Sequence, residues 1–182
     1  MLALLLGRPR SITGYPDKII FLFRYFMSIE INYLAVLVCA VLSMVVGGLW
    51  YGPLFGKKWM EIVGVNSSDL EARKKMQKSA MPLYGVQFLL TLFQVWVLAY
   101  YIAGWKDASG LENSLWIWAA FVVPIVAGSA MWNNDSKRIS WARFLIQAGY
   151  QLVIFAMFGV ILGFWKSQKV YGKEQPRHTI KE

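Results

Sequence analysis

Four glutamine side chains are the residues in the apolar part of this sequence whose types and spacing could do chemistry. Gln87 and Gln94 lie seven residues apart, and Gln147 and Gln151 lie four apart, so each pair shares one face of a helix. An amide in hydrocarbon is costly unless it is paired, so both faces should point inward. Two interpretations stay open: hydrogen bonds that join helices, or a narrow polar path for a small molecule or ion.

Catalytic groups are sparse. Catalysis needs a nucleophile, an acid–base pair or a metal held together, and the four long apolar runs contain no Asp, Glu, Lys, Arg or His. The single cysteine, Cys39, lies inside the first run, and the single histidine, His178, lies in a charged tail. We therefore expect no enzyme, no catalytic residues, no cofactor and no metal site.

The elements that must position these amides are membrane spans. Hydrophobic residues make up 57% of the 182-residue chain, charged residues make up 16%, and the mean hydropathy is +0.44. That much apolar surface needs lipid as well as a core. The apolar runs predict an all-α membrane protein with four transmembrane helices in an antiparallel bundle, at about residues 31–51, 82–102, 115–132 and 144–165.

The domain organisation follows from these spans. Residues 29–166 form the transmembrane domain, and 167–182 form a basic tail that we expect to be disordered. Residues 1–28 are either an interfacial extension or the result of a mis-assigned start, with Met27 as the alternative initiator. With the full chain, ten Lys or Arg fall on one side of the membrane and nine on the other, so orientation is undetermined. Starting at Met27 would place the first and third loops in the cytoplasm.

Basic residues gather in the first loop. Ser68 to Glu71 reads as a capping box that starts a helix, and the cluster that follows consists of Arg73, Lys74, Lys75 and Lys78. Because the bases lie between and outside the apolar runs, they are placed for anionic lipid headgroups and not for nucleic acid.

Near the other end of the sequence, Gly159 and Gly163 are four residues apart, a spacing that lets helix backbones approach. Gly48, Gly52 and Gly56 share that spacing, but Pro53 predicts that Gly56 lies in a loop.

Tryptophans suggest a faint internal repeat. Trp50 and Trp59 are nine residues apart across the first loop, and Trp132 and Trp141 are nine apart across the third. Two helical hairpins related by duplication would explain the pattern, and chance alignment of interfacial aromatics would explain it nearly as well.

An aromatic and turn-forming segment follows the first span. We expect it to form a rigid interfacial elbow that is structural or that shapes a binding mouth, made of Trp50, Tyr51, Gly52, Pro53, Phe55 and Trp59. Together with Ile31 to Val36, Gln147 to Tyr150 and Gly159 to Trp165, this segment resembles the bacterial membrane family called domain of unknown function 1761. The resemblance covers about residues 29–166.

This resemblance implies a four-helix bacterial inner-membrane protein and no particular activity. It also favours Met27 as the start, because the family typically begins just before the Ile-Asn-Tyr segment. The third loop departs from the family pattern at Asn133 to Asp135, and the basic tail is an addition. Our leading expectation is a non-enzymatic protein that packs with itself, a membrane partner or anionic lipid. The alternative is a small passive conduit or binding protein lined by the glutamine faces.

Overall fold

A computed structural model describes residues 30–66, 68–105 and 107–174, with side chains up to residue 166. Almost all of these residues belong to the second of two units, 31–182. The predicted extension at 1–28, including the Met27 alternative, lies outside the described residues, as does the end of the tail from 175 onward.

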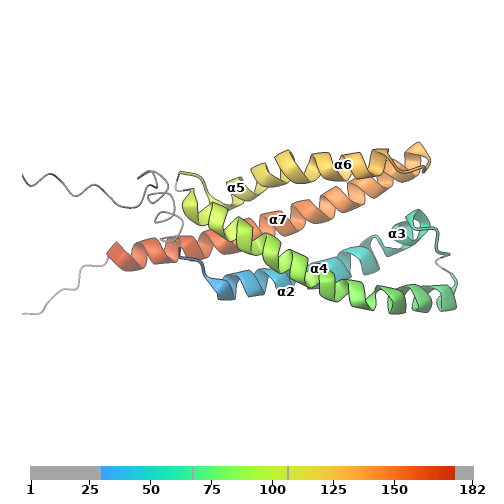
Figure 1. Cartoon of the computed structure of the whole chain (residues 1–182), viewed down its shortest axis with the longest axis horizontal. Coiled ribbons are helices and arrows are strands. Elements are labelled where there is room, and N and C mark those ends of the chain that lie inside the picture. Colours follow the sequence, from blue (N-terminus) through green and yellow to red (C-terminus); the bar gives the residue numbers. More distant parts are fainter. Residues whose placement is uncertain (1–29, 67, 106, 175–182) are drawn as a thin grey trace, which may run out of the picture. The chain divides into compact units, whose positions relative to one another are not determined.

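The described residues form helices joined by short turns (Figure 1). In chain order the elements are α2 (Tyr33–Leu49), η1 (Trp50–Leu54), α3 (Gly56–Ile62), α4 (Leu70–Gly104), α5 (Gly110–Ile117), η2 (Trp118–Val122), α6 (Val123–Met131) and α7 (Lys137–Glu174). Four of the resulting segments are long and apolar enough to cross a membrane, which confirms four transmembrane helices: Tyr33–Leu54, Leu70–Gly104, Gly110–Met131 and Lys137–Lys166.

Two prolines lie in or close to π-helical segments, in which hydrogen bonds join residues five apart. The first span does not stop before Pro53 as predicted, because η1 carries the helix through Pro53 to Leu54. Pro53 has no N–H and cannot donate a backbone hydrogen bond. The π-helical turn is closed instead by the Phe55 N–H, which donates to the Trp50 carbonyl at 2.9 Å. In the third span η2 ends at Val122, and Pro124 is the second residue of α6, which follows it directly.

The bounds of three predicted elements were wrong. The basic segment and the second span form one 35-residue helix, α4, with Pro82 inside it and not in its first turn. Its N-cap is Asp69 and not Ser68, since the Asp69 carboxylate accepts from the N–H groups of Glu71 and Ala72. The third span begins five residues early at Gly110, and α7 continues to Glu174 where we expected a disordered tail.

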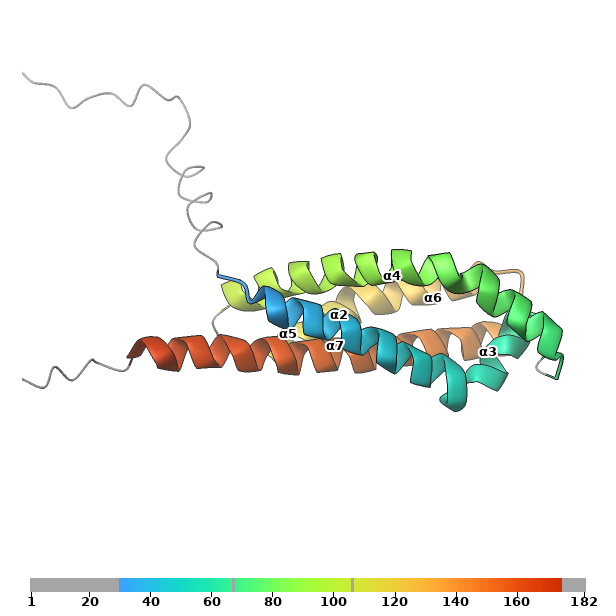
Figure 2. The ribbon, with the colours of Figure 1, turned by 90° about the horizontal axis from the view of Figure 1, so that it is seen from below.

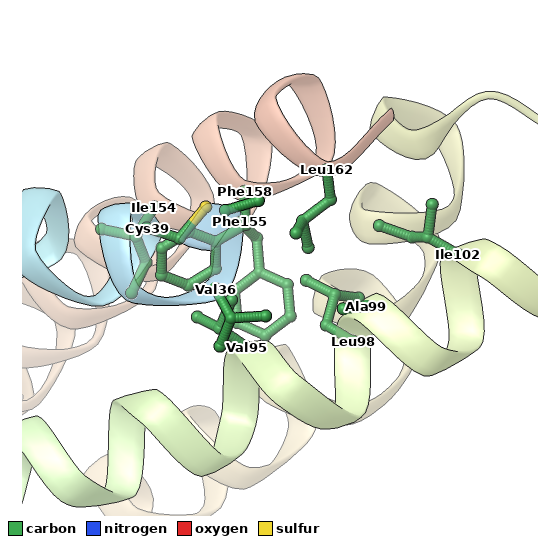
Figure 3. Close-up of a cluster of buried hydrophobic side chains, with 11 residues drawn as sticks. Val36, Cys39, Val95, Leu98, Ala99, Ile102, Ile154, Phe155, Phe158 and Leu162 are labelled. Atoms are coloured by element: carbon green, nitrogen blue, oxygen red, sulfur yellow. The ribbon is translucent and has the colours of Figure 1, made fainter. Parts of the chain in front are cut away.

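Helix α7 is the element around which the others pack. It contacts α2, α3, α4, α5 and α6. Buried side chains of α2, α4 and α7 meet in a single apolar cluster, with Phe158 and Cys39 fully enclosed (Figure 3). By contrast, many large apolar side chains are exposed, among them Phe121 and Ile125 in the third span at 64% and 71%. Such surface suits lipid, which solvates apolar side chains.

Candidate functional site

The predicted elbow is docked on α7. The Trp50 indole N–H donates to the Ile146 carbonyl at 3.0 Å, although 96 residues separate them in the chain. Gly149 leaves room for this ring, because a Cβ there would lie 3.1 Å from Trp50 Cζ2. The first tryptophan of the elbow therefore joins the end of the first span to the first third of the fourth.

Further aromatic contacts close the junction. The ring centroids of Tyr51 and Trp59 are 4.9 Å apart, and those of Tyr51 and Tyr150 are 5.4 Å apart. The Tyr150 hydroxyl donates to the Ser43 carbonyl of α2 at 3.1 Å. The ring centroids of Phe55 and Trp50 are 4.7 Å apart, so the side chains of the elbow contact one another as well as α7. Gly56 is buried at the start of α3, and not in a loop as predicted.

Two of the segments that carry the family resemblance, the elbow and Gln147 to Tyr150, therefore contact each other. A family model described as "Protein of unknown function (DUF1761)" matches residues 34–163 of the chain. The chain belongs to the DUF1761 family. No curated protein and no solved structure matches it.

A second tryptophan of this DUF1761 protein makes the same kind of contact as Trp50. Trp118 donates its indole N–H to the Ala148 carbonyl of α7 at 3.1 Å. Trp50 and Trp118 are each the first residue of a π-helical segment. Sequence reasoning missed this equivalence because it paired Trp50 with Trp132, whose side chain is 91% exposed. The sequence does place a proline after each of these tryptophans, three residues after Trp50 and six residues after Trp118.

Gly159 and Gly163 lie where α7 meets α5. A Cβ on Gly159 would lie 2.6 Å from the Gly110 carbonyl oxygen and 2.6 Å from Ser114 Oγ. A Cβ on Gly163 would lie 3.1 Å from the Gly110 Cα. The absence of side chains at these positions lets the two backbones approach closely. This glycine pair is therefore occupied by a helix of the same chain.

The four glutamines occupy two different settings. On α7, Gln147 and Gln151 are half-buried on the face that also carries Phe155 and Phe158, and the Gln151 Oε1 atom is buried with no hydrogen-bond partner among the described residues. On α4, Gln94 is half-buried, but Gln87 is exposed, and its amide donates to Thr91 Oγ1 at 3.2 Å. The structure does not bring the side chains of the two pairs into hydrogen-bond contact.

Basic residues collect at one end of the helical unit. The start of α4, the short helix α3 and the start of α7 lie at the same end in both views (Figures 1 and 2). Among the described residues this end holds nine Lys or Arg and four Asp or Glu. The following exposed bases lack an ion-pair partner within the described residues: Lys57, Arg73, Lys75, Lys78, Lys137 and Arg138.

One ion pair fastens this end together. Arg143 contacts the Asp135 carboxylate at 2.5 Å and donates to the carbonyl of Ile62, the last residue of α3, at 3.4 Å. The two charged side chains are 19% and 29% exposed, so the pair is partly shielded. Residue spacing in the sequence does not reveal this contact between Arg143 and α3. In the described part of the chain no group of His, Cys, Asp or Glu could hold a metal ion.

Proposed function

We propose that this protein is a non-enzymatic membrane protein that binds anionic lipid headgroups through its basic end and associates with other membrane helices. The observation that carries the proposal is the collection of unpaired, exposed bases from α3, α4 and α7 at one end. Each basic residue near an anionic bilayer surface contributes about 1 kcal/mol, or roughly a fivefold change in affinity.

The depth of the bases on α4 supports this proposal. If the hydrocarbon begins near Pro82, a rise of 1.5 Å per residue places Lys78 about 6 Å and Lys75 about 10 Å outside it. The headgroup layer is about 5–8 Å thick on each side. The Lys78 backbone therefore lies within the phosphate layer, and that of Lys75 lies just beyond its outer edge, from where the long side chain can reach back to it.

Native mass spectrometry in nanodiscs tests the lipid contact. We would compare phosphatidylglycerol with phosphatidylcholine for the wild-type chain and for a variant with Arg73, Lys74, Lys75 and Lys78 changed to Gln. We expect the wild type to retain phosphatidylglycerol and the variant to lose most of that preference. A variant that neutralises exposed acids at the other end, Asp107→Asn with Glu112→Gln, is the control. Equal retention by the wild type and the quadruple variant would refute the proposal.

A passive conduit is the second candidate, and it is supported by Gln151. Its Oε1 atom is buried without a partner in the described structure, and Gln147 lies one turn away on the same face. Proteoliposome shrinkage with urea or glycerol as the permeant tests this function. Gln151→Leu should abolish flux with the fold retained if the amides line a path. If the wild type shows no flux and Gln151→Leu fails to fold, the result would instead favour a packing role for Gln151.

A further inference from the structure

The outer face of α4 has no packing partner within the described chain. From Pro82 to Leu90 every residue is exposed except Phe88, which is half-buried. Helix α4 lies at the edge of the helical unit with no other helix on its outer side (Figure 2). This stretch belongs to a segment that is apolar enough to span a membrane, so its neighbour is either lipid or another protein.

Side chains along one edge of this face follow a heptad pattern. Their spacing alternates between three and four residues, as in the seam of a two-stranded coiled coil: Leu83, Gln87, Leu90, Gln94, Val97 and Tyr101. Leu83 and Leu90 are 64% and 57% exposed. We call these six residues the α4 stripe. Gln87 and Gln94 occupy the same heptad position, a, and the leucines occupy position d.

The amides of the stripe distinguish it from a surface suited to lipid alone. A glutamine side chain offers two N–H donors and an acceptor oxygen, and acyl chains satisfy none of them. Within the described chain Gln87 makes one side-chain hydrogen bond, to Thr91. Its carbonyl oxygen therefore needs a donor from outside the described chain if it faces hydrocarbon.

We propose that a second copy of this chain packs along the α4 stripe as a parallel, two-fold symmetric dimer. Copies inserted in the same orientation are related by an axis along the membrane normal, which places the two α4 helices parallel. In a parallel pair each a position faces its own counterpart, so Gln87 meets Gln87 and Gln94 meets Gln94. The amide is self-complementary, because the N–H of one copy can donate to the oxygen of the other in both layers.

Charge along α4 is compatible with this pairing. Lys74, Lys75 and Lys78 fall at positions b, c and f of the same heptad register, which point away from the seam. Arg73 falls at an a position, but it lies ten residues before Leu83, the first residue of the α4 stripe, and is therefore outside the seam. The dimer rests on the proposed association with other membrane helices and names the partner as a second copy of this chain. The proposed binding of anionic lipid does not depend on the dimer.

Cysteine crosslinking in proteoliposomes tests the register. Leu90→Cys on the stripe and Leu89→Cys beside it at position c are matched in residue type, and the original side chains are 57% and 64% exposed. Facing d positions bring Cα atoms within the 4.4–6.8 Å range of a disulfide. Mild oxidation should give a covalent dimer for Leu90→Cys but little for Leu89→Cys. The parent chain should stay monomeric on the gel, because Cys39 is fully buried.

Amide variants test the chemistry. Gln87→Leu with Gln94→Leu should weaken dimerisation in nanodiscs or mild detergent, on the order of three- to thirtyfold for each amide pair. Gln147→Leu on α7 is the control with the same change in side chain. Retention of phosphatidylglycerol, measured on the same samples, reports lipid binding separately.

Specific results would overturn the dimer. A wild-type chain that stays monomeric by native mass spectrometry at high protein-to-lipid ratio would do so. Equal crosslinking at 89 and 90 would indicate random collision in place of a seam. A different protein crosslinked to Leu90→Cys in cells, without the homodimer, would assign the stripe to another partner. Loss of the dimer with phosphatidylglycerol retained would leave the lipid-binding proposal intact.

Discussion

The contact between α5 and α7 predicts a graded response to adding one methyl group at different glycines. Gly159, Gly163 and Gly128 are all inside helices, so each Gly→Ala change gains a similar amount of helix propensity, up to about 1 kcal/mol. The three positions differ in what the new Cβ would meet. Comparing the variants with one another therefore isolates the steric cost.

Distances set the expected order. Ordinary van der Waals contact begins at 3.4 Å, and a Cβ on Gly159 would lie 2.6 Å from the Gly110 carbonyl oxygen, a deficit of 0.8 Å. The deficit at Gly163 is 0.3 Å, because the nearest atom lies at 3.1 Å, and at Gly128 no atom lies within 4 Å. Two of the atoms facing Gly159 belong to backbone and cannot rotate away. Overpacking of this kind costs about 1–3 kcal/mol.

We expect Gly159→Ala to be less stable than Gly128→Ala by about 1–3 kcal/mol, with Gly163→Ala between them. The assay is unfolding in mixed micelles by titration with sodium dodecyl sulfate, followed by tryptophan fluorescence. Limited proteolysis in the turn between α4 and α5 would report whether the two helices separate. Equal stability of Gly159→Ala and Gly128→Ala would refute the close approach of α5 and α7.

Three further predictions concern the elbow and the basic end. Trp50→Phe should lower stability in the same assay by about 1 kcal/mol through loss of the indole hydrogen bond, whereas Trp141→Phe, at a 64% exposed position, should not. Asp135→Asn should cost about 1–3 kcal/mol, because it leaves the partly shielded Arg143 without its counter-charge, and an unchanged midpoint would contradict this. The side-chain hydrogen bond from Lys58 lowers the pKa of Glu61, so the ion pair should persist above the usual carboxyl range and be lost as pH falls through that lowered pKa. Carboxyl ¹³C titration by NMR should show the Glu61 pKa rising in Lys58→Gln, and no change would count against the pair.

Composition and apolar run length were sufficient for the number and type of membrane spans. A span is recognised by an apolar run long enough to cross the bilayer, and the length of such a run can be counted in the local sequence. Helix ends were harder to predict. Pro53 and Pro82 are strong local signals for a break, but a π-helical turn at Pro53 and the continuous α4 around Pro82 overrode them.

Contacts between distant segments could not be predicted from the residues alone. The Trp50 indole bonds to a carbonyl oxygen, and every residue has one, so nothing in the identity of Ile146 marks it as the acceptor. The Arg143 interaction with the end of α3 has the same character. Glycine spacing did indicate a close helix contact near Gly159, but the contacting helix, α5, began outside the predicted third span.

These contacts locate the places where function should be sought. The elbow, the Gln147–Tyr150 segment and the glycines at 159 and 163 are all used in holding α2, α5 and α7 together. Side chains that fasten one helix to another are not free to bind a ligand without loosening the fold. The surfaces that carry our two main proposals, the unpaired bases at one end and the outer face of α4, lie outside these helix contacts. If both proposals hold, dimerisation through α4 would bring two basic helix starts together and double the charge offered to the same patch of lipid. Lipid retention by the dimer should then fall more steeply with added salt than retention by the Gln87→Leu, Gln94→Leu variant, because more charge is screened at one site.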